Sequence, residues 1–129
     1  HTNAERVRAD RLRAHSIEAA EQCGLLFTPD VEDPAKLNGV LDHWDPARRI
    51  MFCDETADHG AALAVLQAAG SGPWAILIGP EGGFSSDEVE RLRAMECAHP
   101  VSLGPRILRA DTASVAALTL WQTALGDWR

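Results

Sequence analysis

The sequence has few cysteines, and they are not spaced like metal ligands. Cys23, Cys53 and Cys97 are scattered along the 129 residues, and their number is odd. The chain has no Cys-x-x-Cys pair and no cysteine–histidine spacing typical of zinc sites, so the sequence predicts neither a metal site nor a disulfide framework. We expect buried free thiols in a cytoplasmic protein, because the cytoplasm keeps thiols reduced.

The sequence also lacks long apolar runs and an excess of positive charge. No stretch of about eighteen apolar residues occurs, and no membrane span is therefore expected. The formal net charge is −7, which makes the chain a poor stand-alone binder of RNA, because contacts to phosphate supply most non-specific affinity. The composition, with 46% apolar and 24% charged residues, is that of an ordinary globular domain.

The length predicts one domain over residues 1–129. The chain begins with His1 rather than with a methionine or a signal peptide, and we expect it to be a fragment of a longer chain. Four arginines gather on the first predicted helix, at positions 6, 8, 11 and 13. Two interpretations of them stay open, a solvated helix face and a basic strip that contacts RNA.

Hydrophobic periodicity predicts helices that alternate with short strands. We expect helices over residues 2–22, 33–44, 59–69, 85–96 and 111–125, and strands over residues 25–28, 49–53, 74–78 and 100–103. This alternation predicts an α/β fold in which helices flank a parallel sheet. The nearly continuous apolar run at 74–78 is expected to be the central strand. The last helix has apolar residues on more than one face, so it should be buried or paired.

Two segments join a predicted strand to a predicted helix through glycine and proline. Residues 79–83 read Gly-Pro-Glu-Gly-Gly, and Ser85 with Glu88 forms a capping box for the following helix. Such a corner is a common ligand site in α/β proteins, but this one matches neither of the best-known phosphate loops. A plain connecting turn therefore stays open. Asp54 and Glu55 follow the strand 49–53 and could contact a ribose hydroxyl, although a solvated turn is the favoured interpretation.

The motif at 78–84, followed by Leu-Gly-Pro-Arg-Ile-Leu-Arg-Ala-Asp-Thr-Ala at 103–113, resembles the C-terminal domain of RsmE-type 16S ribosomal RNA uridine-N3 methyltransferases. Residues 18–24 and Pro29 resemble the same family's first helix and the strand after it. The resemblance implies a SPOUT-type fold with a deep C-terminal trefoil knot, and a homodimer paired through the last helix. It also implies S-adenosylmethionine (SAM) as methyl donor, 16S rRNA of the small subunit as partner, and an N-terminal RNA-binding domain outside this sequence.

The resemblance also implies roles for individual residues. Arg109 and Arg106 are the leading catalytic candidates, since a guanidinium can pair with a phosphate or with the developing uridinate oxygen. Glu81 and Asp111 are candidate acceptors for the N3 proton, and Asp111 stands where the family more often has Glu. No metal is expected. The implied cofactor-binding residues are Ile78, Gly79, Glu81, Gly82, Gly83, Leu103, Gly104, Ile107, Leu108 and Ala113.

Three hypotheses for the function remain. The first is the catalytic domain of an rRNA methyltransferase, and the second is a non-catalytic dimerisation or RNA-docking module of the same fold. The third is an unrelated nucleotide-binding domain of flavodoxin-like type. Binding of SAM separates the first from the second, and knot topology separates both from the third.

Overall fold

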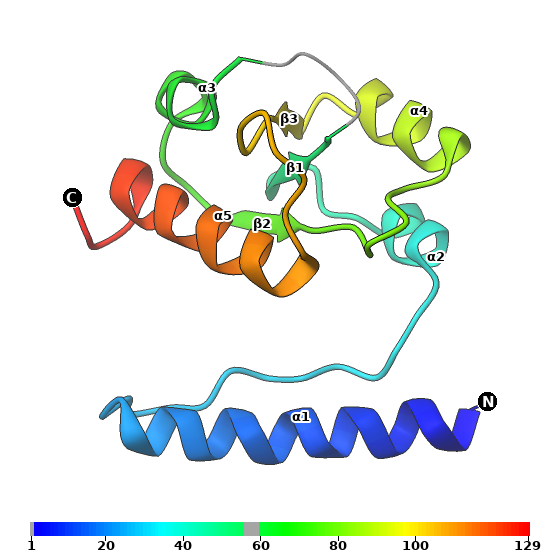
Figure 1. Cartoon of the computed structure of the whole chain (residues 1–129), viewed down its shortest axis with the longest axis vertical. Helices are drawn as coiled ribbons and strands as arrows, with labels where there is room; N and C mark the ends of the chain where they lie inside the picture. The colour runs from blue at the N-terminus through cyan, green and yellow to red at the C-terminus, as the bar shows by residue number, and fades with distance from the viewer. Residues whose placement is uncertain (1, 56–59) are drawn as a thin grey trace. The chain divides into compact units, whose positions relative to one another are not determined.

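A computed structural model describes residues 2–55 and 60–129, with side chains described from residue 8 onward except at 56–59. The chain forms two compact units, His1–His43 and Trp44–Arg129, which are described separately (Figure 1). The side chains of Thr2, Glu5 and Arg6, and the residue His59, lie outside the described residues. The predicted first capping box, the predicted start of the third helix and part of the arginine strip are therefore not tested.

The first unit begins with a long helix, α1 (Thr2–Gln22). It ends in a Schellman motif, in which the backbone N–H of Leu25 donates to the carbonyl of Ala20 (2.9 Å) and that of Gly24 to the carbonyl of Glu21 (3.3 Å). This motif needs a left-handed residue, and Gly24 adopts φ 71°. The predicted helix and its glycine cap are confirmed.

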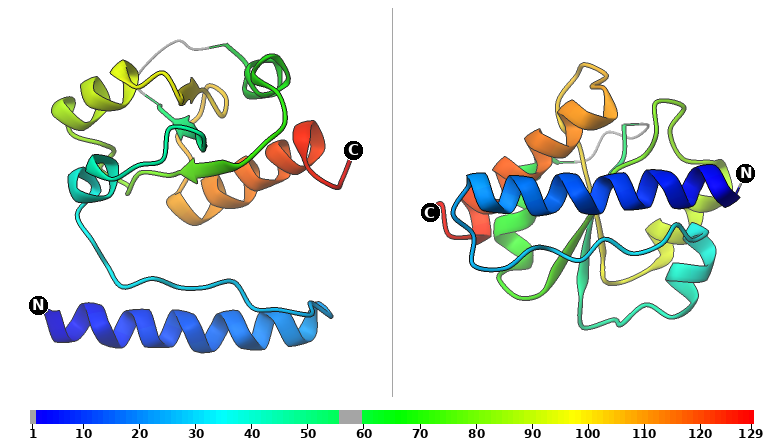
Figure 2. Two further views of the ribbon diagram at one scale, coloured as in Figure 1. Left: turned by 180° about the vertical axis from the view of Figure 1, so that it is seen from behind. Right: turned by 90° about the horizontal axis from the view of Figure 1, so that it is seen from below.

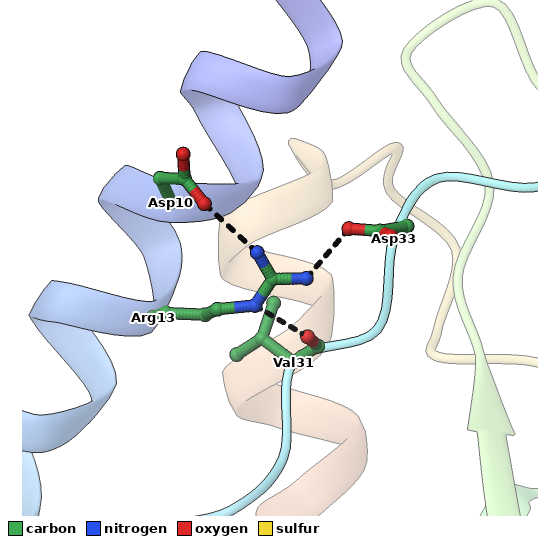
Figure 3. A network of polar contacts seen from close by, with 4 residues as sticks. All are labelled: Asp10, Arg13, Val31 and Asp33. Carbon is green, nitrogen blue, oxygen red and sulfur yellow. Dashed lines mark hydrogen bonds and ion pairs between the residues drawn. The ribbon is translucent and has the colours of Figure 1, made fainter.

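Arg13 ties α1 to the extended segment that follows it. Its Nε donates to the carbonyl of Val31 (2.8 Å), while the two terminal nitrogens donate to Asp10 (2.9 Å) and Asp33 (2.7 Å), as Figure 3 shows. The hydrogen bond to Asp33, together with the charge of Asp33 and the contact with Asp10, raises the pKa of Arg13. One of the four arginines for which contact with RNA was an open interpretation is thus engaged within its own unit.

Two sequence predictions in this unit are wrong. Residues 25–28 form no strand; a strand needs a hydrogen-bonded neighbour, and the side chain of Leu26 is 100% exposed. The second helix, α2 (Leu37–Asp42), begins four residues after the predicted start at Asp33. The carboxylate of Asp33 accepts from Arg13 instead, and the N-cap position falls to Lys36, which makes no side-chain cap bond.

The second unit is built on a parallel sheet of three strands within the described residues. These are β1 (Arg49–Cys53), β2 (Trp74–Leu77) and β3 (Ala98–Val101), in the order β2-β1-β3. The prediction that residues 74–78 form the central strand is therefore wrong, because β1 is central. Burial agrees with this order: the three inner residues of β1 are all buried, whereas β2 has one buried residue.

Helices cover both faces of this sheet, as Figures 1 and 2 show. On one side, α3 (Ala62–Ala69) and α5 (Ala110–Leu125) pack against each other, and Leu66 and Ala117 join a core with Met51. On the other side, α4 (Ser86–Ala94) buries Leu92 completely. Alternate residues of β1 point to opposite faces, and both faces are filled. The predicted α/β fold with a flanked parallel sheet is confirmed.

Several smaller predictions can be checked. The capping box of α4 is present, since Ser85 and Glu88 exchange hydrogen bonds (3.2 and 2.8 Å). All three cysteines are free, but Cys23 is exposed and the other two are half-buried, so the expectation of buried thiols is wrong for Cys23. It directly follows the last residue of a solvated helix. Across the described residues, no helix is long and apolar enough to cross a membrane.

Candidate functional site

A pocket opens in the second unit where the carboxyl ends of the three strands meet. The empty space within it, open solvent at its mouth included, is about 670 Å³. Cys53 and the two acids after it come from the end of β1, Ile78 follows β2, and Ser102 follows β3. This is the edge at which α/β proteins bind ligands.

The first glycine loop, residues 79–83, is shaped by a turn and by contact with an aromatic ring. The backbone N–H of Gly83 donates to the carbonyl of Pro80 (2.8 Å), and Gly83 takes φ 75°. A Cβ on Gly79 would lie 2.8 Å from the ring of Phe84, so glycine is required there for the close approach. Phe84 packs edge-on against Phe52, with ring centroids 5.0 Å apart. This contact fixes the loop to the central strand.

The second loop leads from β3 into α5. Gly104 takes φ 109°, and its N–H donates to the hydroxyl of Ser102 (3.2 Å). Arg109 occupies the N-cap position of α5, and its carbonyl accepts from the N–H of Ala113 (2.7 Å). Ala113 is buried, so the first turn of the helix forms part of the wall of the pocket.

Nine of the thirteen predicted site residues line this one pocket. They are Ile78, Gly79, Glu81, Gly83, Leu103, Gly104, Arg106, Leu108 and Ala113. The structure describes the other four, Gly82, Ile107, Arg109 and Asp111, outside the lining. The side chain of Arg109 is 81% exposed and its Nε lies 3.7 Å from Asp111. Segments about 25 residues apart in the sequence are thus brought to one site. Arg109 lies outside the lining, between Leu108 and Ala110, which both belong to it.

Sequence reasoning named Asp54 but assigned the wrong surroundings to it, because this is the most deeply buried acid among the described residues. Asp54 is 2% exposed and pairs with Arg93 of α4 (2.7 Å), so the interpretation as a solvated turn is wrong for it. Glu55 is exposed, as that interpretation expects, although both acids line the pocket. The sequence held one signal for the burial of Asp54, which is its position directly after the strand 49–53. This is the strand with the most continuous burial.

Cys53 also lines the pocket, but it is not poised as a nucleophile. Burial raises the pKa of its thiol to about 12, so the neutral thiol prevails at physiological pH, whereas reactive cysteines have lowered pKa values. Across the described part of the chain, no group of three or more His, Cys, Asp or Glu side chains could hold a metal ion.

Comparisons with known proteins point to one family. A family model for the RNA methyltransferase domain matches residues 1–122. The chain is 32% identical over 114 residues to the ribosomal RNA small subunit methyltransferase E of Rickettsia conorii, covering 87% of this chain and 46% of that protein. It thus spans about half the length of this relative.

Two solved structures are similar to the chain. The first is a ribosomal RNA small subunit methyltransferase E from Neisseria gonorrhoeae bound to S-adenosyl methionine (28% identity, TM-score 0.76, 98% of this chain and 52% of that one). The second is a methyltransferase from Legionella pneumophila with the bound cofactor SAM (26% identity, TM-score 0.76, 96% of this chain and 49% of that one).

Proposed function

Because the chain belongs to the RNA methyltransferase domain family, we propose that it is an RsmE-type catalytic domain that binds SAM and methylates N3 of a uridine in 16S rRNA. One observation carries this proposal. The two loops singled out from the sequence, residues 78–83 and 103–108, contribute most of the residues that surround one pocket. The relatives described above include proteins whose structures hold SAM.

The residues of the pocket fit such a cofactor. Ile78, Leu103 and Leu108 offer apolar walls suited to an adenine ring, and the glycine loops expose backbone donors and acceptors next to them. Carboxylates at Asp54, Glu55 and Glu81 face a pocket that would hold a positively charged donor. Gly82 and Ile107 fit the proposal less directly, as backbone neighbours of lining residues, since the side chain of Ile107 is 82% exposed.

Bound SAM supplies an already activated methyl group, so three tasks in the reaction remain for the chain itself. The chain must hold the donor, orient the uridine and help to remove the N3 proton, and orientation alone can supply several kcal/mol of the barrier. We assign Arg109 and Arg106 to the RNA phosphate or to the developing uridinate oxygen. Both are exposed, and Arg106 lines the pocket. Glu81 and Asp111 are the candidate proton acceptors.

Four further features belong to the proposal and follow from the family resemblance. They are a deep C-terminal trefoil knot, a single SPOUT domain over residues 1–129, action on cytoplasmic ribosomes without a metal, and a homodimer paired through α5.

The homodimer has support on α5. The side chains of Val115 and Leu118 are 67% and 53% exposed, while Trp121 packs against the protein's own core. Light scattering should give about twice 13.9 kDa for this chain.

The test is transfer of tritium from labelled SAM to small ribosomal subunits by the intact protein. Methylation should appear at N3 of a uridine, and Arg109→Ala should reduce kcat by about a hundredfold or more while leaving SAM affinity within about threefold, because the exposed guanidinium serves the RNA. Loss of SAM affinity would make Arg109 a cofactor residue. Failure of the protein to bind SAM would favour the docking-module alternative.

A further inference from the structure

Directly after α1, three consecutive large apolar side chains lie in solvent. The side chains of Leu25, Leu26 and Phe27 are 54%, 100% and 76% exposed. We call these three residues the apolar turn. A single exposed apolar side chain is ordinary on a protein surface, whereas a contiguous apolar patch marks a surface that binds a partner.

The backbone on both sides of the apolar turn is fixed to α1. The N–H of Leu25 donates to the carbonyl of Ala20 in the helix cap (2.9 Å). After the turn, the hydroxyl of Ser16 donates to the carbonyl of Pro29 (3.5 Å), and Arg13 holds the segment further along, as Figure 3 shows. The turn therefore presents its side chains in a defined conformation, which lowers the entropy cost of binding a partner.

The charges near the apolar turn favour a protein partner over RNA. Between residues 14 and 32 the sequence has no lysine or arginine and carries the acids Glu18, Glu21, Asp30 and Glu32. Arg13, the nearest arginine in the sequence, is already paired with two aspartates. Carboxylates repel the phosphates on which RNA affinity depends. An apolar centre with an acidic rim instead fits a protein surface that has an apolar centre and a basic rim.

A basic partner of this kind is expected within the full-length protein. The chain spans 46% of the Rickettsia conorii enzyme and 52% of the Neisseria gonorrhoeae chain, so about half of each relative lies outside the matched part. The net charge of this chain is −7, and the substrate under the proposed function is a polyanion. The remainder of the protein must then supply the positive charge that RNA binding needs. Domains of one chain commonly meet through interfaces that resemble transient protein–protein contacts.

We propose that the apolar turn is the docking surface for the RNA-binding remainder of the full-length protein. Leu26 and Phe27 form the centre of this contact, and Glu21 and Asp30 lie on its rim. The inference rests on the part of the proposed function that assigns RNA binding to residues outside this chain. Docking at the turn gives the domain that holds the RNA a fixed position relative to the first unit.

The test uses Cys23, which is exposed and lies two residues before the apolar turn. Its rate of alkylation by a maleimide, followed by peptide mass spectrometry, is compared between this chain and the full-length protein. Cys23 should react about tenfold or more slowly in the full-length protein, because the reagent must wait for the docked domain to open. The half-buried Cys53 and Cys97 serve as internal references and should keep their rates.

Two variants of the full-length protein locate the contact. Leu26→Ser combined with Phe27→Ser should return the rate of Cys23 to that of this chain, and both positions are exposed here, so the first unit should still fold. Leu118→Ser is the matched control, since it changes a leucine of the second unit that is 53% exposed. It should leave Cys23 protected.

Each other outcome overturns the proposal. Equal rates of Cys23 in the two proteins would show that the remainder does not cover the turn. Slow alkylation already in this chain would assign the turn to the chain itself or to a second copy, and protection that requires added small ribosomal subunits would assign it to RNA. The alkylation needs neither SAM nor methyl transfer, so its result is separate from that of the tritium assay.

Discussion

Two of the arginine–aspartate pairs, Arg13–Asp33 in the first unit and Arg93–Asp54 in the second, have the same length and very different surroundings. Arg13 and Asp33 lie 2.7 Å apart, and the side chain of Asp33 is 81% exposed; Arg93 and Asp54 also lie 2.7 Å apart, and that of Asp54 is 1% exposed. Exposed pairs contribute little because water screens them, whereas a buried charge is costly once its partner is removed. Hydrogen-bond length therefore says little about energetic importance, and burial decides it.

The same contrast holds for the apolar residues of the two units. In His1–His43, several large apolar side chains are exposed, Phe27 at 76% among them, and Leu41 is the one large apolar side chain buried among its described residues. In Trp44–Arg129, the side chains of Phe52, Leu66 and Leu92 are completely buried. The second unit holds the core that gives the pocket fixed walls.

The largest expected effect is on that core. Leu92→Ala should lower the free energy of unfolding by about 3 kcal/mol, since the residue is 0% exposed and truncation leaves a cavity. The matched change Leu26→Ala, at a fully exposed site, should stay within about 0.5 kcal/mol. Chemical denaturation followed by circular dichroism measures both. Equal losses would show that Leu26 is buried in solution, and the contrast between the units would fail.

The two ion pairs should differ by nearly as much. Arg93→Met should cost about 3 kcal/mol of stability, the low end for breaking a buried pair, because Arg93 is partly exposed and is not the only interaction partner of Asp54. Arg13→Met, in the exposed pair, should have little effect. Melting curves at low and high salt provide the comparison, and a strong salt dependence of the Arg93 contribution would contradict its assignment as a buried pair.

Two glycines of the first loop provide a finer test of the pocket's rigidity. Gly79→Ala would bring a Cβ within 2.8 Å of the Phe84 ring, while a Cβ at Gly82 meets no described atom within 4 Å. We expect Gly79→Ala to weaken SAM binding about tenfold, equivalent to about 1.4 kcal/mol, and Gly82→Ala to change it by less than about threefold. A similar loss for both would mean that any side chain added to this loop weakens binding, and that the close approach to Phe84 does not set the effect.

The smallest expected effect is a pH dependence at the amino ends of the strands. Burial, together with the charge of Arg49, lowers the pKa of His99, whose ring lies 5.3 Å from that of Trp74. The unfolded chain then takes up a proton first, so stability should fall as the pH drops below about 6.5, the ordinary value for histidine. His99→Gln should flatten this decline in a series of melts, whereas His15→Gln, at an exposed position of α1, should not.

Local signals in the sequence predicted much of this fold. The strand 49–53 and the capping box at Ser85 are encoded within a few residues, by burial pattern and by spacing, and both are confirmed. The strand predicted at 25–28 fails because the sequence does not show whether an apolar run finds a neighbouring strand. The order of strands failed for the same reason, since apolar runs at 49–53 and 74–78 look alike locally.

The candidate site shows the same division. The residues of the two loops were found because they form contiguous motifs that resemble a known family, and most of them line the pocket. Asp54 was assigned to a solvated turn because its partner Arg93 is 39 positions away. No local pattern links two such residues, and the pairing becomes visible when α4 is packed on the sheet.

The central claim, that this pocket holds SAM, is tested most directly by titrating SAM into the protein by calorimetry with a chelator present. Binding with a one-to-one stoichiometry per chain is expected, and Gly79→Ala should weaken it while Leu26→Ala should not. The absence of any binding heat at several temperatures would contradict the account, if the protein concentration is about a hundred micromolar, within the range of roughly 1 μM to 1 mM typical of KM values.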